Sequence, residues 1–385
     1  MHIVYFTTAQ RDKDWNEFYP KWRISLNPSN QNFHNKLIRS LAINNDVDVI
    51  SIRPFSHQNS SFKYLNKFTI KDNDHLSWHY IKRSGGKIYR NLSLFPEAKK
   101  VLSNLDLRNT VFITDTINPG VLKVAIKAKH KYNCPLIGVC TDSPSNISNT
   151  GRSYTLSLLK QASQIDGFIS LTEELNQLFN VRNLPSFILE GLLEDEIKVT
   201  QTNSTRPYFF FGGSLMRKYG VYNLIEAFKQ LDIKTMDLII CGHHENKEEI
   251  KEAIKGAANI HYLKLLPIHK VHEYENDAVA CVNPRPYNED LDRFSIPSKT
   301  IEYLYSNSLT ISLKNTKLMH RFIDAAIWVN SNEISDLKTA LLEAVNMDVN
   351  KRKKMIANAN AIAKDLYSLS SVAKQIQSFL ANFIR

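Results

Sequence analysis

The feature that most constrains the fold of this 385-residue chain is a rhythm of short apolar runs separated by helical patterns, and the rhythm occurs twice. Such alternation is typical of parallel βαβ units. A polar stretch at 194–207, which contains Thr-Gln-Thr-Asn-Ser-Thr-Arg-Pro, separates the two series and offers too little apolar surface to pack. The sequence therefore predicts an α/β protein with two doubly wound domains, as the length of the chain also favours.

Each series predicts its own strands and helices. In the first, strands are expected at His2–Phe6, Val47–Ile52, Val111–Thr114, Pro135–Val139, Gly167–Ser170 and Phe187–Leu189, with helices starting near Asn30, Lys87, Pro119, Ser153 and Thr172. In the second, strands are expected at Tyr208–Phe211, Met236–Cys241, Ile260–Tyr262, Ala278–Val282, Leu309–Ser312 and Ile327–Val329, with helices near Tyr219, Lys247, Ile268, Pro297 and Asn315. Helical patterns at Lys351–Lys364 and Ser370–Arg385 close the chain.

These patterns predict the domain boundaries. An N-terminal domain is expected at 1–193, a linker at 194–207 and a second domain at 208–366, followed by a C-terminal helix at 367–385 that packs on the N-terminal domain. In doubly wound sheets, ligands bind outside the carboxyl ends of the strands. A ligand site is therefore expected in a cleft between the two domains.

Cysteine usage and the N-terminus indicate the compartment. The four cysteines form no CxxC pair and lie in or beside apolar runs, which is typical of buried reduced thiols in a reducing environment. The first residues lack the basic and long apolar regions of a signal peptide, and no stretch reaches the roughly 18 apolar residues of a membrane span. A cytoplasmic location is expected.

The net charge of +11 suggests an anionic partner, since a basic surface attracts nucleic acid, anionic lipid or phosphorylated substrates. Residues 63–131 hold 14 lysines and arginines against five acidic residues, and apolar side chains such as Ile88 and Phe95 lie close to these cations. Interleaving of this kind suits peripheral contact with an anionic membrane at the inner face of the plasma membrane. An ordinary solvated helix explains the pattern equally well. Nucleic-acid binding is suggested by charge alone and has no motif.

The strongest functional signal is the strand–loop–helix segment at 282–304. Its helix opens at Pro297, and proline is favoured in a first helical turn. Free backbone N–H groups at such a start, together with the side chain of Lys299, form a diphosphate site. Ser298 and Glu302 are four residues apart and share one helix face, which places a ribose near the carboxylate. The alternative is an amphipathic helix with these side chains in solvent.

Asn283-Pro-Arg285 followed by Phe294-Ser-Ile-Pro-Ser-Lys-Thr-Ile-Glu-Tyr303 resembles the donor segment of family 4 glycosyltransferases, most closely the branch that builds bacterial capsular and exopolysaccharides. The resemblance implies the retaining GT-B fold, with two Rossmann-like domains facing a central cleft and C-terminal helices returning to the N-domain. It also implies that Glu302 holds the nucleotide ribose. Many members carry an E-x7-E pair, but the first position here is Phe294, so only the second glutamate carries over.

A second signal follows the first strand of the second domain. Gly212-Gly213-Ser214 ends that strand, and Arg217 and Lys218 come before the next helix. Glycines permit close backbone approach to a phosphate, and the cations neutralise it. A lone Gly-Gly pair is usually a turn. The segment nevertheless resembles the family loop that grips the donor diphosphate, although Ser214 stands where arginine is usual.

The third signal lies in the N-terminal half. The segment Asn27-Pro-Ser-Asn-Gln-Asn-Phe-His34, which includes Asn32, precedes the first expected helix, where the resemblance implies a loop that faces the donor phosphates and the acceptor. Simple helix capping is an equal alternative. Asp115 and Asp142 follow two strands and project toward the expected cleft. Asp142 stands where many family members have a histidine-containing segment, so it either orients the acceptor or makes a turn before Pro144.

A metal site is not expected. His243 and His244 are adjacent, so on an extended segment their side chains point to opposite sides and cannot easily share one ion. No H-E-x-x-H or carboxylate-rich D-x-D motif accompanies them. The sequence thus predicts that no metal or other cofactor takes part.

The leading hypothesis is metal-independent transfer, hexosyltransferase-like, from a nucleoside diphosphate sugar to a saccharide or lipid-linked saccharide, in cell-surface polysaccharide or glycoconjugate synthesis. Lys218, Arg217 and Lys299 would stabilise charge on the departing diphosphate. The resemblance implies front-face attack with retention. Two alternatives remain open: a non-catalytic GT-B partner subunit of an active transferase, and a nucleotide-sugar epimerase. The donor sugar, the acceptor and the oligomeric state are not determined by the sequence.

Overall fold

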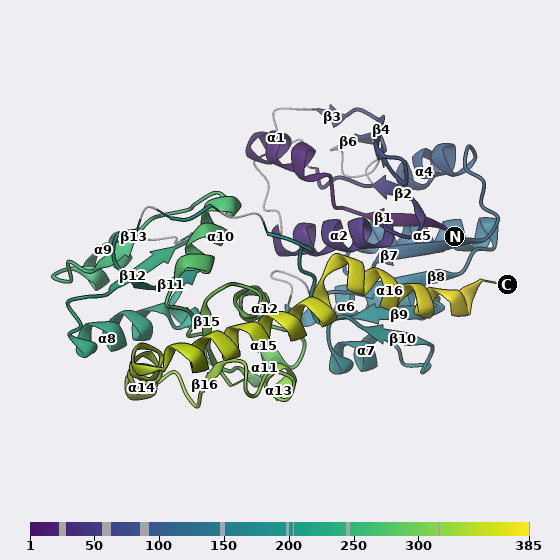
Figure 1. Ribbon diagram of the computed structural model, residues 1–385. Coiled ribbons are helices and arrows are strands. Elements are labelled where there is room, and N and C mark those ends of the chain that lie inside the picture. The colour runs from purple at the N-terminus through teal and green to yellow at the C-terminus, as the bar shows by residue number, and fades with distance from the viewer. Residues whose placement is uncertain are drawn as a thin grey trace. The chain divides into compact units, whose positions relative to one another are not determined.

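The computed structural model describes residues 1–22, 28–55, 63–84, 92–146, 151–197, 200–202, 204–243, 247–314 and 316–384. The chain divides into two compact units (Figure 1). Unit 1 comprises residues 1–192, 293–295 and 367–385, and unit 2 comprises residues 193–292 and 296–366. Each is a three-layer α/β unit around a sheet that is parallel at its centre, so the predicted doubly wound architecture is confirmed.

Unit 1 contains an eight-stranded sheet of order β10-β9-β8-β7-β1-β2-β5-β4. All neighbouring strands are parallel except the edge pair β4 and β5. The strands are β1 (His2–Thr7), β2 (Asp46–Ser51), β4 (Phe68–Asn73), β5 (Leu76–Tyr80), β7 (Thr110–Asp115), β8 (Leu136–Cys140), β9 (Gly167–Ser170) and β10 (Ser186–Ile188). The short strands β3 (Tyr64–Leu65) and β6 (Arg83–Ser84) form a separate antiparallel pair.

Alternate side chains of β1 enter two different cores in unit 1. Ile3 and Tyr5 pack with α2 (Pro28–Leu41) and α16 (Leu369–Leu380), which lie side by side on one face. Val4 and Phe6 pack on the opposite face with α4 (Leu94–Leu102), α5 (Pro119–Tyr132), α6 (Arg152–Ala162) and α7 (Glu173–Phe179). Because both faces are covered, the central strands are apolar throughout. The C-terminal helix α16 thus belongs to the core of the N-terminal unit.

Unit 2 contains a six-stranded, fully parallel sheet of order β13-β12-β11-β14-β15-β16. Its strands are β11 (Tyr208–Gly212), β12 (Asp237–Cys241), β13 (Ile260–Tyr262), β14 (Ala280–Asn283), β15 (Leu309–Leu313) and β16 (Ile327–Val329). The strand order reverses between β11 and β14. In open parallel sheets this switch point is where ligands bind, beyond the carboxyl ends of the strands.

In unit 2 as well, alternate side chains of the first strand, β11, pack into apolar clusters on opposite faces of the sheet. Phe209 and Phe211 pack with α8 (Val221–Leu231), α9 (Lys247–Ile254) and α14 (Ile334–Asn346). Tyr208 and Phe210 face α10 (Ile268–Asp277) and Tyr303 of α12 (Ser298–Leu304). Each fully buried aromatic side chain contributes about 2–3 kcal/mol relative to an exposed one. The remaining helices are α1 (Asp12–Trp22), α11 (Glu289–Asp292), α13 (Thr316–Met319) and α15 (Val349–Tyr367), with 3-10 turns at Pro144–Asn146, Arg217–Tyr219 and Ala381–Phe383.

Most predicted strands of the central sheets are confirmed within two residues, but several elements were missed. The sequence did not indicate α1, α14 or the strands between Tyr64 and Ser84. The segment 28–34, expected to precede the first helix, lies inside α2, which is the second helix of the chain. The helix expected near Lys87 and the side chain of Ile88 lie outside the described residues.

Candidate functional site

Two backbone turns at the carboxyl edge of the unit 2 sheet lie in close contact. Gly242, directly after β12, has a φ of +143°, and a Cβ atom there would lie 1.6 Å from the carbonyl oxygen of Gly213. The N–H of Gly213 donates to the carbonyl of Cys241 at 3.0 Å. Glycine is required at 242 because the adjoining backbone leaves no room for a side chain. The predicted Gly213 amide is therefore already used within the turn.

The loop after β11 presents its two cations at the surface. Arg217 is exposed, pairs with Glu249 at 2.5 Å and stacks on the ring of Tyr222 at 4.4 Å. Lys218 is also exposed and lies 5.2 Å from the ring centre of Tyr219. Ser214, in the same loop, is half-buried. This loop adjoins the loop after β14, since a Cβ on Gly220 would lie 2.0 Å from the carbonyl oxygen of Pro284.

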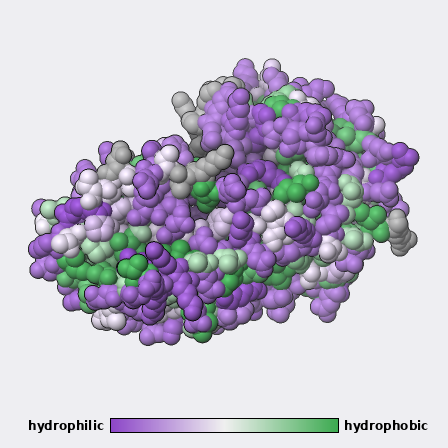
Figure 2. Space-filling view, in the orientation of Figure 1, coloured by the Kyte–Doolittle hydropathy of each residue, from purple (hydrophilic) through white to green (hydrophobic). Residues whose placement is uncertain are grey.

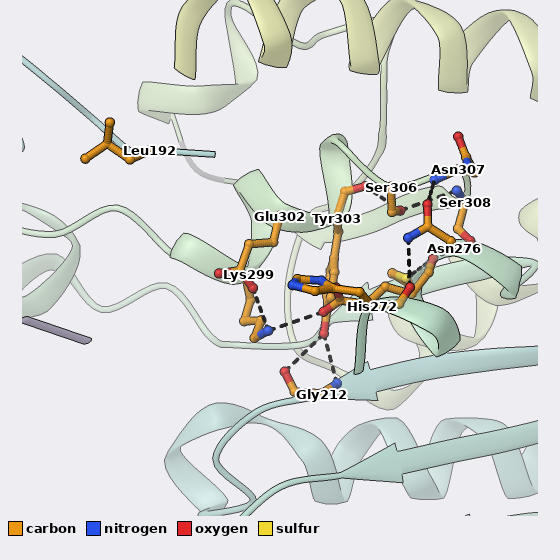
Figure 3. A network of polar contacts seen from close by, with 12 residues as sticks. Leu192, Gly212, His272, Asn276, Lys299, Glu302, Tyr303, Ser306, Asn307 and Ser308 are labelled. Carbon is orange, nitrogen blue, oxygen red and sulfur yellow. Dashed lines mark hydrogen bonds and ion pairs between the residues drawn. The ribbon is translucent and has the colours of Figure 1, made fainter. Parts of the chain in front are cut away.

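Helix α12 carries the densest cluster of charged side chains near the switch point. Pro297 is its N-cap, and Ser298 is the first helical residue and is exposed. The ammonium nitrogen of Lys299 lies 2.5 Å from Glu302 Oε2 and 3.2 Å from Glu275 Oε1, which α10 contributes. Figure 3 shows Lys299 and Glu302 on the same helix with His272 opposite them. Lys299 and Glu302, two of the predicted site residues, are thus in direct contact, and Glu275 joins them.

The electrostatics of this cluster favour a charged lysine. Burial lowers the pKa of Lys299, but the carboxylates of Glu302 and Glu275 outweigh burial and hold that pKa well above its ordinary value. Tyr303, which follows Glu302 on α12, is fully buried, and its hydroxyl accepts a hydrogen bond from the N–H of Gly212 at 2.9 Å. Burial raises the pKa of Tyr303 well above its usual range. Tyr303 therefore joins α12 to the end of β11 as a neutral phenol.

Beneath α12, a chain of polar side chains fixes the end of β14. The Asn283 amide donates to Thr300 Oγ1 at 2.8 Å, and Thr300 lies 3.0 Å from Ser312 Oγ on β15. Arg285, predicted to bind the donor, donates to Asp292 Oδ1 at 2.7 Å and is half-buried. In this structure Arg285 therefore braces the loop between β14 and α12.

Unit 1 has a polar cluster at the carboxyl ends of β1, β7 and β8. Asp115 is fully buried and accepts from the backbone N–H of Ile117 at 2.9 Å. His34 Nε2 lies 3.7 Å from Asp115 Oδ2, so the structure brings these two predicted residues together. Asn30 links Asp115 to Thr141: its amide nitrogen donates to Asp115 Oδ2 at 3.5 Å, and its amide oxygen accepts from Thr141 Oγ1 at 3.0 Å.

Burial keeps His34 in its neutral form. It lowers the pKa of His34, and the negative charge of Asp115 opposes this only in part. The ring nitrogen Nδ1 lies 2.7 Å from the hydroxyl of Tyr5, whose pKa burial raises. The result is a buried group of neutral hydrogen-bonding side chains around one carboxylate.

The two other predicted residues of unit 1 are less buried than His34 and Asp115. Asn32 is exposed on α2, and it is Asn30 that reaches Asp115. Asp142 is half-buried and its Oδ1 accepts from the backbone N–H of Ser143 at 2.8 Å, which is the turn-forming contact considered for it.

An open cavity of about 370 Å³ lies elsewhere in unit 1, between β4, β5 and α4. Its lining combines apolar side chains, including Phe68, Tyr80 and Val101, with Lys67 and Lys100. Nearby Tyr64 and Leu92 are large exposed residues. The face shown in Figure 2 is largely hydrophilic, with apolar residues scattered over it.

Neither a metal cluster nor a membrane span is found in the described part of the chain. No group of three or more His, Cys, Asp or Glu side chains there is arranged to hold an ion. His243 is exposed, and His244 lies outside the described residues. None of the described helices is both long and apolar enough to cross a bilayer.

A sequence comparison relates most of unit 2 to a known family. A family model of the glycosyl transferases group 1 matches residues 194–361. Residues 194–361 are therefore similar to this family, and the match spans less than half of the chain. This match covers every predicted donor residue from Gly213 to Glu302 and none of the predicted residues of unit 1. No curated protein matches the chain in sequence.

Solved structures extend the similarity to the whole chain. Sucrose-phosphate synthase from Thermosynechococcus elongatus has a TM-score of 0.71 at 11% identity, with 99% of each chain covered. Anabaena HepE in complex with UDP has a TM-score of 0.69 at 11% identity, covering 99% of this chain and 100% of the other. A UDP-forming α,α-trehalose-phosphate synthase from Burkholderia xenovorans in complex with glucose-6-phosphate has a TM-score of 0.64 at 10% identity, with 99% of each covered. These similarities confirm the predicted GT-B fold.

The sequence analysis did not single out three residues that complete the clusters around Lys299 and Asp115, namely Glu275, Asn30 and Tyr5. Glu275 lies in the polar run His-Lys-Val-His-Glu-Tyr-Glu-Asn-Asp, which reads as a solvated helix face. Only the fold places it beside Lys299, 24 residues later. Tyr5 has no local motif, and Asn30 lies within the polar segment 27–34 without being singled out in it. The one signal available was the concentration of polar residues at 27–35.

Proposed function

We propose that this chain is a retaining glycosyltransferase that moves a sugar from a nucleoside diphosphate sugar, bound by unit 2, to a hydroxyl of a saccharide or lipid-linked saccharide. The observation that carries the proposal is the Glu302 carboxylate. It lies one turn into α12, beside the switch point of the region similar to the group 1 glycosyltransferases, at the position where the motif resemblance puts the ribose ligand. A carboxylate accepts hydrogen bonds from both hydroxyls of a ribose.

In this proposal the phosphates of the donor lie near the loop after β11. Arg217 and Lys218 are exposed there and offer positive charge to the departing diphosphate. The acceptor oxygen forms a bond to the anomeric carbon on the face from which the diphosphate leaves, so the configuration is retained. The acceptor proton passes to the departing phosphate oxygen. Catalysis then rests on positioning and charge, without a nucleophile or a metal.

Unit 1 is proposed to serve the acceptor. The buried Asp115, with neutral His34 beside it, supplies a hydrogen-bond acceptor for a sugar hydroxyl. The cavity, whose lining includes apolar side chains, Lys67 and the ion pair of Lys100 with Glu97, suits an acceptor with an apolar part, such as a lipid-linked saccharide at the inner face of the plasma membrane. Synthesis of surface polysaccharide is the corresponding biological setting.

A non-catalytic partner subunit is the second candidate, and one observation favours it. Phe294 stands at the first position of the family's glutamate pair and packs against the apolar core of unit 1. It therefore offers no polar group to a donor sugar. Such a subunit would bind nucleotides weakly and transfer nothing.

A thermal-shift screen against UDP-, GDP- and CDP-sugars tests the proposal, because a ligand that binds only the native state raises its stability. We expect one nucleotide class to raise the Tm of the wild type and to do so much less in Glu302→Gln. Glu343→Gln, at an exposed position of α14, is the matched control and should respond like the wild type. Two similar structures are described with UDP or as UDP-forming, so UDP-sugars come first. No shift with any nucleotide would contradict the proposal.

A further inference from the structure

The ammonium group of Lys299 lies between two carboxylates that come from different helices. Glu302 Oε2 is 2.5 Å away on the same helix, and Glu275 Oε1 is 3.2 Å away on α10. The side chains of Lys299 and Glu302 are 29% and 23% exposed, whereas that of Glu275 is 2% exposed. Ligands in solvent can therefore reach Lys299 and Glu302 but not Glu275.

Glu275 is itself firmly held. Its second oxygen, Oε2, lies 2.9 Å from His272 Nδ1, one turn earlier on α10. Its backbone carbonyl accepts from Ser308 Oγ at 2.6 Å and from Cys281 Sγ at 3.3 Å. Both carboxylate oxygens and the carbonyl thus have partners (Figure 3 shows His272 and Ser308 in this network). A buried carboxylate fixed in this way is a rigid anchor for a cation.

The charges of the cluster argue against a phosphate at Lys299. One ammonium and two carboxylates sum to −1, and two of the three N–H donors of Lys299 are engaged. Such a group repels an anion and attracts hydroxyl donors. Without Glu275, Lys299 and Glu302 would be an ordinary pair three residues apart on a partly exposed helix, and pairs of that kind are weakly ordered.

We infer that Glu275 is a positioning residue: it holds the ammonium of Lys299, and Lys299 fixes the Glu302 carboxylate for the two hydroxyls of the donor ribose. This rests on the proposed function and changes the role of Lys299, which acts through Glu302 on the ribose and not on the diphosphate. The substitutions Glu275→Gln and Lys299→Met should therefore weaken the recognition of ribose hydroxyls and leave the recognition of phosphate unchanged.

Calorimetry with UDP and 2′,3′-dideoxy-UDP tests this, or with the corresponding guanosine pair if the donor screen selects GDP. We expect Glu275→Gln and Lys299→Met each to weaken binding of UDP about tenfold, the order expected for one hydrogen bond to a charged group. Binding of the dideoxy nucleotide should change less than twofold, and Lys299→Arg should restore most of the affinity for UDP. Glu252→Gln, in the exposed pair with Lys255 on α9, is the control and should change neither.

Two results would overturn the inference. Equal weakening of both nucleotides by Lys299→Met would place the ammonium on the phosphates, and unchanged affinity in Glu275→Gln would remove its positioning role. If Glu275→Gln does not fold, His272→Gln can replace it, because that substitution changes the contact to Glu275 Oε2. We expect it to weaken UDP binding in the same way but by a smaller factor. A wild-type protein that binds no nucleoside diphosphate would instead refute the proposed function, which keeps the two failures distinct.

Discussion

Both units are built on a doubly wound sheet with a parallel centre, but they differ in the side chains that lie at the carboxyl ends of their strands. Unit 2 collects full charges: Lys299 with its carboxylates, and exposed cations in the loop after β11. Unit 1 collects buried, mostly neutral groups around a single carboxylate, Asp115. The same scaffold thus offers two chemistries, and the difference suits a charged nucleotide on one unit and a sugar hydroxyl on the other.

The largest expected effect is on nucleotide binding, which the account assigns to unit 2. Glu302→Ala should weaken binding of the donor nucleotide about 100-fold, since two hydrogen bonds from hydroxyls to a charged group are lost at about 1.5 kcal/mol each. Its Tm without ligand should stay close to that of the wild type because the side chain is partly exposed. Calorimetry measures the affinity, with Glu343→Gln as the control. If Glu302→Ala bound the nucleotide as tightly as the wild type, the assignment of the nucleotide to this cluster of unit 2 would be wrong.

The next prediction compares the glycines of the two sheets. Gly242→Ala should destabilise the protein by about 3 kcal/mol, because the new methyl group would meet backbone at 1.6 Å and the φ is positive. In unit 1, Gly138→Ala would meet the side chains of Ile165 and Thr116 at 2.7 and 2.8 Å, and side chains can shift. Its cost should be smaller, about 1–2 kcal/mol. Urea denaturation ranks the two, and the reverse order would contradict the packing described.

Acid should weaken unit 1 through Asp48. Burial would raise the pKa of Asp48, but hydrogen bonds from His2 and His79 outweigh it and lower that pKa to about 2. Its contribution is complete above the ordinary value of 3.8 and is lost as pH falls through 2, about 2 kcal/mol in all. Denaturation of the wild type and Asp48→Asn at pH 5 and pH 2 should show the wild type losing more.

The smallest effect concerns Asp115. Asp115→Asn should lower the rate of transfer about tenfold, because a neutral amide is a weaker acceptor for a sugar hydroxyl than a carboxylate. Donor affinity should stay within twofold of the wild type, since the donor residues belong to unit 2. Steady-state kinetics and calorimetry give the two numbers. A fall in donor affinity without a change in rate would assign Asp115 to the donor.

The sequence predicts the central strands well because each is a short apolar run that both helical layers bury. Edge elements are harder: β4 is mostly exposed, so its residues Phe68–Asn73 show no strong alternation. Helix α14 was also missed, although it is amphipathic and buries Leu337, Ala340, Leu341 and Ala344. Local periodicity therefore reports burial, and it fails for strands whose burial is slight.

Only those residues of the candidate site that lie within one local sequence motif could be predicted from the sequence. Ser298, Lys299 and Glu302 follow one another within a motif, so spacing alone places them on one helix. Glu275 and Asn30 enter through tertiary contacts from other helices. Nothing near Glu275 in the sequence indicates its role, and Asn30 is marked only by the polar segment 27–34 that contains it. Their partners became apparent only from the fold.

The most direct test of the central claim is a crystal structure of the protein with the sugar nucleotide that the thermal-shift screen selects. The account predicts both ribose hydroxyls within hydrogen-bond distance of the Glu302 carboxylate, with Lys299 still held by Glu275. A sugar nucleotide bound elsewhere, with Glu302 contacting only Lys299, would contradict it.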